Sequence, residues 1–294
     1  MTVLARVRTY GSLVSLSHTV FAMPFAASAV VLSLAVPHEA PSPLRIVAMA
    51  ACMVFARTSA MAFNRWADRT FDARNPRTRG RHLPAGTVGA GEALGLAAVS
   101  GTAFLAVAAT LGRWPAILAP GVLAVLLGYS YAKRFTWGAH AWLGIALALA
   151  PGGAWIAMSA PPGIGIVLLM AAVMTWLLGF DVLYSLQDER FDREAGLHSI
   201  PARFGATLAL RISATSHVAT VLALAGVGFA LHRGAPYAFG VLTCALLLGY
   251  EHSLVHRRGL AAIDRAFFDI NAWISVAFFA LVAIDELARR VRGG

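Results

Sequence analysis

Charged residues are scarce in this sequence. Only 13% of the 294 residues are Asp, Glu, Lys or Arg, against about 25% in soluble domains. No polar segment is long enough to form a soluble unit, and 59% of the residues are hydrophobic. We therefore predict an all-α, polytopic integral membrane protein, with a single transmembrane domain over residues 1–294.

Cysteine and acidic residues are also few. Cys52 and Cys244 both lie in apolar runs, which excludes a disulfide framework and a cysteine metal site. The sequence has 14 Asp and Glu but 24 Lys and Arg, which gives a net charge of +10. No basic patch with interleaved aromatic residues is present, so we expect no nucleic-acid partner. The positive excess instead fits the positive-inside bias of membrane proteins and an anionic substrate.

Nine apolar runs are long enough to cross a bilayer at about 20 residues per crossing. They lie at 13–36, 44–63, 93–112, 114–132, 138–158, 164–185, 208–231, 235–254 and 266–284. With a cytoplasmic N-terminus, most Lys and Arg of the connecting segments fall on the cytoplasmic side. The basic C-terminal tail is the exception, because it falls on the opposite side. We expect about nine transmembrane helices around a central cavity, in the cell inner (cytoplasmic) membrane.

A first polar motif, NRWADRTFD, follows the apolar run 44–63. Asn64, Asp68 and Asp72 are four residues apart, so they share one face of a helix. They lie where a membrane helix reaches the headgroups, and carboxylates there are costly without a cationic partner. The motif is therefore a candidate set of three oxygen ligands.

A second motif ends the apolar run 164–185. Asp181, Tyr184, Asp188 and Asp192 are spaced three, four and four, again on one helical face. Both motifs lead through arginines to a Pro-Ala element, a weak internal repeat that would bring them to one cavity. Two facing acidic sets can hold divalent cations such as Mg²⁺ and leave positions for diphosphate oxygens.

The simplest alternative is that these acids form interfacial ion pairs with neighbouring arginines, Arg65, Arg69 and Arg74. One motif alone would leave the two interpretations about equal. The same spacing at the ends of two spans favours a functional role.

Several cations are candidates for substrate binding. Arg57 lies seven residues before Asn64, deeper in the span, where it needs an anionic partner from the protein or the substrate. Lys133 and Arg134 end the run 114–132, either as positive-inside anchors or as cavity cations. In the second case Lys133 would bind phosphate as a point charge and Arg134 would bind phosphate or carboxylate as a planar fork.

These residues resemble a known family. NRWADRTFD resembles the N-x-x-x-D-x-x-x-D motif of the UbiA superfamily of membrane prenyltransferases, and DVLYSLQDERFD resembles its Y-x-x-x-D-x-x-x-D motif. The resemblance covers nearly the whole chain. SHTVFAMPFA, LHSIPARFG and YEHSLV resemble the 4-hydroxybenzoate polyprenyltransferase-like group, which includes menaquinone-pathway members. His82-Leu83-Pro84 departs from the Arg-Pro-Leu-Pro of many relatives, but Arg77, Arg79 and Arg81 are kept.

The resemblance implies Mg²⁺-assisted transfer of a polyprenyl group from a polyprenyl diphosphate to a hydroxylated aromatic acid, 4-hydroxybenzoate or a dihydroxynaphthoate, in ubiquinone or menaquinone biosynthesis. Asp68 and Asp188 would be catalytic, and Asp181 or Tyr184 would orient the ring or the allylic cation. The isoprenoid tail would reach membrane lipid, and the active site would face the cytoplasm. The implied metal ligands are Asn64, Asp68, Asp72, Asp188 and Asp192. The candidate substrate-binding residues are Arg57, Asn64, Arg77, Lys133 and Arg134.

Other functions fit the sequence less well. Another branch of the superfamily, prenylating a haem, chlorophyll or homogentisate precursor, is the nearest rival. A CDP-alcohol phosphotransferase would need an Asp-Gly element that is missing here. A secondary transporter would use intramembrane residues such as Arg57 and Asn271, but it predicts charges near the bilayer midplane, whereas the acids cluster at span ends.

Overall fold

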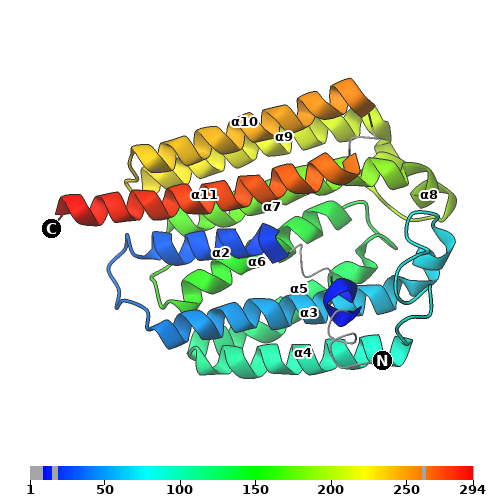
Figure 1. The fold of residues 1–294 in the computed structure, drawn as a ribbon, viewed down its shortest axis with the longest axis horizontal. Helices are drawn as coiled ribbons and strands as arrows, with labels where there is room; N and C mark the ends of the chain where they lie inside the picture. Colours follow the sequence, from blue (N-terminus) through cyan, green and yellow to red (C-terminus); the bar gives the residue numbers. More distant parts are fainter. Residues whose placement is uncertain (1–8, 15–18, 260–262, 294) are drawn as a thin grey trace.

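The computed structural model describes residues 9–14, 19–259 and 263–293. Within these ranges the regular structure is helical and contains no strand (Figure 1). The elements are α2 (Thr19–Ser33), α3 (Pro43–Arg74), α4 (Ala90–Thr110), α5 (Arg113–Ala132), α6 (Ala139–Ala157), α7 (Ile164–Ser185), the 3₁₀ turn η2 (Leu186–Asp188), α8 (Glu189–Glu194), α9 (Ile200–Ala230), α10 (Ala235–Arg258) and α11 (Ile263–Gly293).

The expectation of an all-α, multi-pass membrane protein is confirmed. Eight helical segments in the described part of the chain are long and apolar enough to cross a membrane. They begin with α3, while the apolar part of α2, Ala22–Ser33, is shorter. The first expected run, 13–36, lies partly outside the described residues, so the ninth crossing stays a prediction.

Glycines and a serine cap set the helix ends on either side of two turns. α4 and α5 are separated by Gly112, whose φ of +125° is accessible mainly to glycine. α9 begins at Ile200, earlier than the expected residue 208, because Ser199 caps it by accepting a hydrogen bond from the Ala202 amide at 3.3 Å. A kink at Gly205, with φ of +78°, then turns the chain into the long part of α9.

The length of α3 positions the first motif. Its 32 residues extend about 48 Å at 1.5 Å per residue, whereas the hydrocarbon core is about 30 Å thick. The helix starts at the Ser42 cap and Pro43, so its last turns, which carry Asn64 to Asp72, project toward the headgroup level.

The second half of the chain packs tightly around α7. A Cβ at Gly144 of α6 would lie 2.5 Å from the Met174 carbonyl oxygen, so glycine lets α6 and α7 approach closely. Trp176 of α7 is buried against Phe25 of α2, and its indole nitrogen donates to Asn271 of α11 at 2.8 Å. Asn271 therefore bonds neighbouring helices, as an amide inside a membrane span is expected to do.

Arg45 joins three helices at the end of the molecule opposite α8. Its guanidinium donates to the Leu111 carbonyl and the Ser159 hydroxyl, both at 2.7 Å, and also to the Ala157 carbonyl. Leu111 and Ala157 lie at the C-terminal ends of α4 and α6, where carbonyl groups lack helical partners and a positive charge is favourable. The side chain thus ties the start of α3 to both helix ends.

A buried ion cluster fixes α11 at the same end. Arg233, with a fully buried side chain, pairs with Asp285 at 2.8 Å and Glu286 at 3.0 Å. Arg289 and Arg290 each pair with Glu286 at 3.1 Å, and Arg289 also donates to the Leu34 carbonyl. The cluster therefore connects the turn between α9 and α10, the last helix and the end of α2.

Candidate functional site

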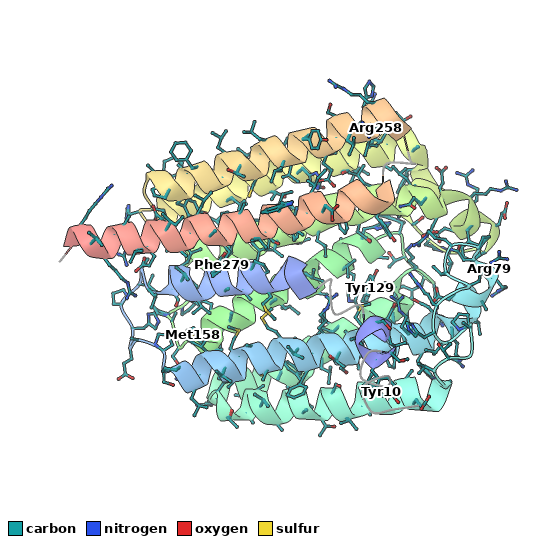
Figure 2. The ribbon with its side chains drawn as sticks, viewed as in Figure 1. Tyr10, Arg79, Tyr129, Met158, Arg258 and Phe279 are labelled. Atoms are coloured by element: carbon teal, nitrogen blue, oxygen red, sulfur yellow. The ribbon has the colours of Figure 1, made fainter. Side chains whose placement is uncertain are left out.

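Both acidic motifs lie at the same end of the molecule. Figure 1 shows the C-terminal end of α3 and the short helix α8 side by side, opposite the C-terminus. Figure 2 places Arg79 and Arg258 at this end and Met158 toward the other. The repeat in the sequence predicted this convergence.

The first motif lies on one face of the uninterrupted helix α3, as predicted. Asn64 Nδ2 donates to Asp68 Oδ2 at 2.9 Å. Asp68 Oδ1 accepts from Arg134 Nη2 at 3.3 Å, and the same nitrogen donates to the Ala67 carbonyl at 2.7 Å. Because the Arg134 guanidinium also lies 4.6 Å from the centre of the Tyr131 ring, it docks the end of α5 onto the motif.

Asp72 is buried at the last turn of α3. Its Oδ1 accepts from Arg81 Nη1 at 2.8 Å, across the loop that follows the helix. Its Oδ2 is buried and has no hydrogen-bond partner among the described residues. A buried carboxylate oxygen without a partner is costly, and a metal ion is one way to satisfy it.

The second motif does not lie on one continuous α-helix, as the first motif does. α7 ends at Ser185, η2 follows, and α8 begins at Glu189. Each residue of a 3₁₀ turn advances by about 120° instead of 100°, so the spacing of four no longer superimposes Tyr184, Asp188 and Asp192. Tyr184 and Asp188 share Arg77 as a partner, whereas Asp192 pairs with Lys133.

Asp188 is held by the loop after the first motif. Arg77 donates to both of its oxygens, with Nε at 3.0 Å from Oδ1, and Asn75 Nδ2 donates to Oδ1 at 3.1 Å. Arg77 Nη1 also donates to the Tyr184 hydroxyl at 2.9 Å. Arg77, Asn75, Gln187 and Asp188 line a cavity of about 590 Å³. The loop after the first motif thus connects it to the second motif.

Lys133 and Asp192 form the next pair. Lys133 Nζ lies 3.2 Å from Asp192 Oδ2, and Asp192 is almost fully buried. Burial by itself would lower the pKa of Lys133, but the carboxylates of Asp192, Asp181 and Asp188 outweigh it and raise that pKa above its ordinary value. Lys133 is therefore a permanent cation within the acidic cluster.

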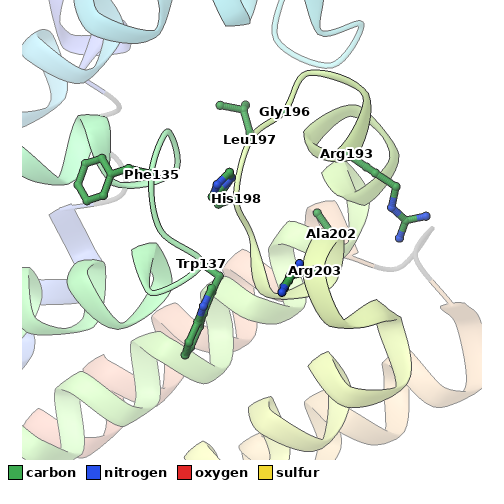
Figure 3. Close-up of a pocket in the computed structure, with 8 residues that line it drawn as sticks. All are labelled: Phe135, Trp137, Arg193, Gly196, Leu197, His198, Ala202 and Arg203. Atoms are coloured by element: carbon green, nitrogen blue, oxygen red, sulfur yellow. The ribbon is translucent and has the colours of Figure 1, made fainter.

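A second cavity, of about 440 Å³, adjoins this pair (Figure 3). The His198 amide donates to the Lys133 carbonyl at 2.6 Å, which places the segment before α9 against the end of α5. Phe135, Trp137, Arg193, Gly196, Leu197, His198, Ala202 and Arg203 line the cavity. None of the predicted site residues is among them.

Asp181 faces a partner that sequence reasoning missed. Its Oδ2 lies 2.6 Å from Nδ1 of His140, which is fully buried at the start of α6.

Tyr129 of α5 was missed too, although it interacts electrostatically with Asp68, Asp181 and Asp192. Asn75 is the third missed residue. Its Asn-Pro dipeptide marks a turn after the first motif, and a histidine inside the run 138–158 marks an uncommon polar group in a membrane helix.

Four further arginines of α3 were named in the sequence analysis. Arg57 is half-buried in α3, about two turns deeper than Asn64. Arg69 and Arg74 fold back onto α3, donating to the carbonyls of Trp66 and Thr70. Asp68 and Asp72 therefore form ion pairs with Arg134 and Arg81 of other segments and not with Arg69 or Arg74. Arg65, the third arginine of the ion-pair alternative, interacts electrostatically with both acids.

Comparison with known proteins gives a consistent result. The sequence model of the UbiA prenyltransferase family matches residues 22–281. A protein of Nitrosospira multiformis named 4-hydroxybenzoate octaprenyltransferase is 31% identical over 237 residues, which cover 80% of this chain and 81% of that protein. A protein of Aromatoleum aromaticum with the same name is 32% identical over 247 residues, covering 83% and 82%.

Solved structures share the fold. The apo structure of a UbiA homolog from Aeropyrum pernix has a TM-score of 0.82 at 33% identity and covers 92% of this chain and 98% of its own. A UbiA homolog from Archaeoglobus fulgidus, bound to GPP and Mg²⁺, has a TM-score of 0.72 at 19% identity, covering 94% and 99%. The motifs, the helical architecture and these matches agree, and the chain belongs to the UbiA prenyltransferase family.

Proposed function

We propose that this protein transfers a polyprenyl group from a polyprenyl diphosphate to a hydroxylated aromatic acid, with residues 1–294 acting as one transmembrane domain. One observation carries the proposal. Asp68 pairs with Arg134, Asp188 pairs with Arg77, and both pairs lie at one end of the helices. The 4-hydroxybenzoate octaprenyltransferases cited above favour 4-hydroxybenzoate over a dihydroxynaphthoate.

The acidic residues fit Mg²⁺ by their chemistry. Mg²⁺ takes oxygen ligands and is bound through one or two carboxylates together with substrate phosphates. Within the described ranges, no three His, Cys, Asp or Glu side chains converge to hold a metal by themselves, so a substrate diphosphate would complete the shell. We assign the donor oxygens to Asn64, Asp68, Asp72, Asp188 and Asp192. When bound, Mg²⁺ supplies Lewis-acid assistance to the departure of diphosphate.

The basic residues of the site can bind phosphate in place of the carboxylates with which they now pair. Each of the acids Asp68, Asp72, Asp188 and Asp192 pairs with an Arg or Lys from another segment. With a divalent ion held by these carboxylates, the paired Arg and Lys side chains would be able to bind phosphate oxygens instead. Arginine and phosphate form charge-assisted hydrogen bonds of the strongest kind found in proteins. We assign this role to Arg77 and Lys133.

A membrane assay tests the whole proposal. Membranes containing the protein are supplied with a labelled prenyl diphosphate and a panel of acceptors, with and without Mg²⁺. The panel contains 4-hydroxybenzoate, a dihydroxynaphthoate and homogentisate, together with haem and chlorophyll precursors. We expect Mg²⁺-dependent transfer to a hydroxylated aromatic acid. Transfer only to another acceptor would move the chain to a different branch, and no transfer to any acceptor would contradict the proposal.

Arg134 is our candidate for the acceptor's carboxylate. Its planar guanidinium is held between the Tyr131 and Phe71 rings, beside Asp68. A bidentate contact between two charged groups is stronger than an ordinary hydrogen bond. We expect Arg134→Ala to raise the KM of the acceptor far more than that of the diphosphate, measured by steady-state assay.

Arg69→Ala is the matched control, because that guanidinium is bound to its own helix. It should leave both KM values close to those of the wild type. If Arg134→Ala instead raises mainly the KM of the diphosphate, Arg134 belongs to the phosphate site.

We further propose an inner-membrane location with the acidic end in the cytoplasm, where phosphorylated substrates and Mg²⁺ are available. The Lys/Arg bias of the connecting segments supports this orientation. The isoprenoid chain would extend between apolar helices into membrane lipid. A transporter is disfavoured because the acids cluster at one end of the helices.

Cysteine labelling tests this topology. Arg79 and Glu39 are exposed at opposite ends, and the native Cys52 and Cys244 are buried, so each introduced thiol reports alone. In intact cells, an impermeant maleimide should label Glu39→Cys and not Arg79→Cys. Labelling of both variants would overturn the proposed orientation.

A further inference from the structure

His140 lies at the junction of three helices beside the acidic cluster. It is the second residue of α6 and is fully buried. Nδ1 lies 2.6 Å from Asp181 Oδ2 on α7, and Nε2 lies 3.2 Å from the amide nitrogen of Ile200, the first residue of α9. The histidine therefore connects the acidic residue to a helix start.

These two contacts indicate the donor and acceptor roles of the two ring nitrogens. A backbone N–H can only donate, so Nε2 must accept and carry no proton. The proton of the neutral ring is then on Nδ1, which donates to Asp181. An imidazolium would direct a second N–H at the Ile200 amide and would leave the first amide of α9 without its partner.

Asp181 differs in this respect from the other acids of the cluster. Asp68, Asp72, Asp188 and Asp192 are each bound to an arginine or lysine, whereas the hydrogen-bond partner of Asp181 is neutral. A carboxylate bound by a guanidinium or ammonium group has that cation on its oxygens, whereas Asp181 uses one oxygen for His140. The described residues form no hydrogen bond to Asp181 Oδ1, and the side chain keeps 16% exposure. Among the described residues, Oδ1 therefore keeps its capacity to accept a hydrogen.

We propose that Asp181 accepts the proton that leaves the aromatic ring, and that His140 is the positioning residue that holds it. This inference rests on the proposed function. The allylic C–O bond breaks, and its electron pair leaves with diphosphate. A ring electron pair then forms the new C–C bond. The proton on that ring carbon moves to Asp181 Oδ1, the C–H electron pair returns to the ring, and the proton passes to solvent.

The position of Asp181 suits this step. It lies one turn before Tyr184 on α7, and Arg77 bonds both the Tyr184 hydroxyl and Asp188, so Asp181 lies next to the assigned metal ligands along the helix without pairing with them. Neutral His140 cannot take up the proton at Nε2 while Ile200 donates to it. Asp181 is thus the terminal acceptor within this dyad.

An isotope experiment separates this role from a structural one. The acceptor is 4-hydroxybenzoate with deuterium on every ring carbon, compared with the unlabelled compound. Asp181→Asn keeps the size of the side chain and the hydrogen bond from His140 but removes the base. We expect kcat to fall by about 10²–10⁴-fold, as for the loss of a general base, with a larger kinetic isotope effect than in the wild type and little change in the KM of the diphosphate.

Three further variants complete the test. His140→Phe removes both hydrogen bonds and should also enlarge the isotope effect, while His140→Gln, which offers a donor and an acceptor, should restore part of the rate. Ser199→Ala removes the side-chain cap of the same helix α9 without touching Asp181. It should lower thermal stability and leave the isotope effect at its wild-type value.

The outcomes are distinguishable. An unchanged isotope effect in folded Asp181→Asn overturns the inference and leaves the proposed function intact. Absence of transfer by the wild-type protein overturns the proposed function instead. If His140→Phe does not fold, Asp181→Asn decides the role of the base, and His140→Gln decides that of the histidine.

Discussion

Asp68→Asn and Asp188→Asn should each lower kcat by at least ~100-fold, comparable to the loss of one group that stabilises charge in a transition state. Each change preserves size, replaces one acceptor oxygen by an NH2 donor and removes a negative charge from the proposed metal shell. The leaving diphosphate is then stabilised less, and added Mg²⁺ should restore only part of the rate. Steady-state kinetics on purified protein would measure both effects.

The double variant tests whether the two acids act on one diphosphate. Its loss should be much smaller than the product of the single losses, because residues that act as a unit are not additive. Glu194→Gln is a matched control, since Glu194 lies at the same end in an exposed pair with Arg190. It should leave kcat near the wild-type value.

The ion-pair interpretation predicts the opposite. If Asp68 only balances Arg134, Asp68→Asn should reduce expression or thermal stability, while the purified variant keeps its turnover and its Mg²⁺ dependence. Turnover within a few-fold of the wild type in both single variants would contradict the assigned roles of the two acids.

Removing divalent cations should abolish turnover without unfolding the protein. A chelator withdraws the Lewis acid on which diphosphate departure depends. The carboxylates Asp68, Asp72, Asp188 and Asp192 have basic partners within the protein, so no uncompensated acidic cluster results. We therefore expect activity at background level and a melting temperature close to that of the untreated protein, measured on the same sample.

Adding back different cations completes this experiment. Mg²⁺ should restore activity, whereas Ca²⁺, which prefers more ligands at longer distances, should restore little. Turnover that persists in the chelator would exclude an essential metal. A large fall in melting temperature would instead indicate that the metal holds the two motifs together.

Features set by local periodicity could be predicted from the sequence. The spacing of Asn64 and Asp68 predicts a shared helical face, and the structure joins their side chains directly. Long apolar runs likewise predict the membrane helices, because backbone groups within the bilayer must be satisfied inside each segment. The charged ends of these runs placed both motifs at one end of the molecule.

Features set by contacts between distant segments could not be predicted. Periodicity gives the face of a helix but not the residue that approaches it, so the partners Arg77, Arg81 and Arg134 were not assigned to their acids. The 3₁₀ turn that ends at Asp188 contains no proline or glycine that would indicate it in the sequence. His140 was missed because its two partners come from α7 and α9.

The ion cluster around Arg233 has a consequence for the order of assembly during synthesis. Asp285 and Glu286 belong to α11, so a nascent chain that ends before this helix carries Arg233 without its partners. Breaking a buried ion pair by removing one side costs about 3–5 kcal/mol. α11 also packs against α2, the first of the labelled helices. Vectorial synthesis therefore cannot complete this fold from its N-terminal half, and we expect truncated chains to be recognised as unassembled until the last helix inserts.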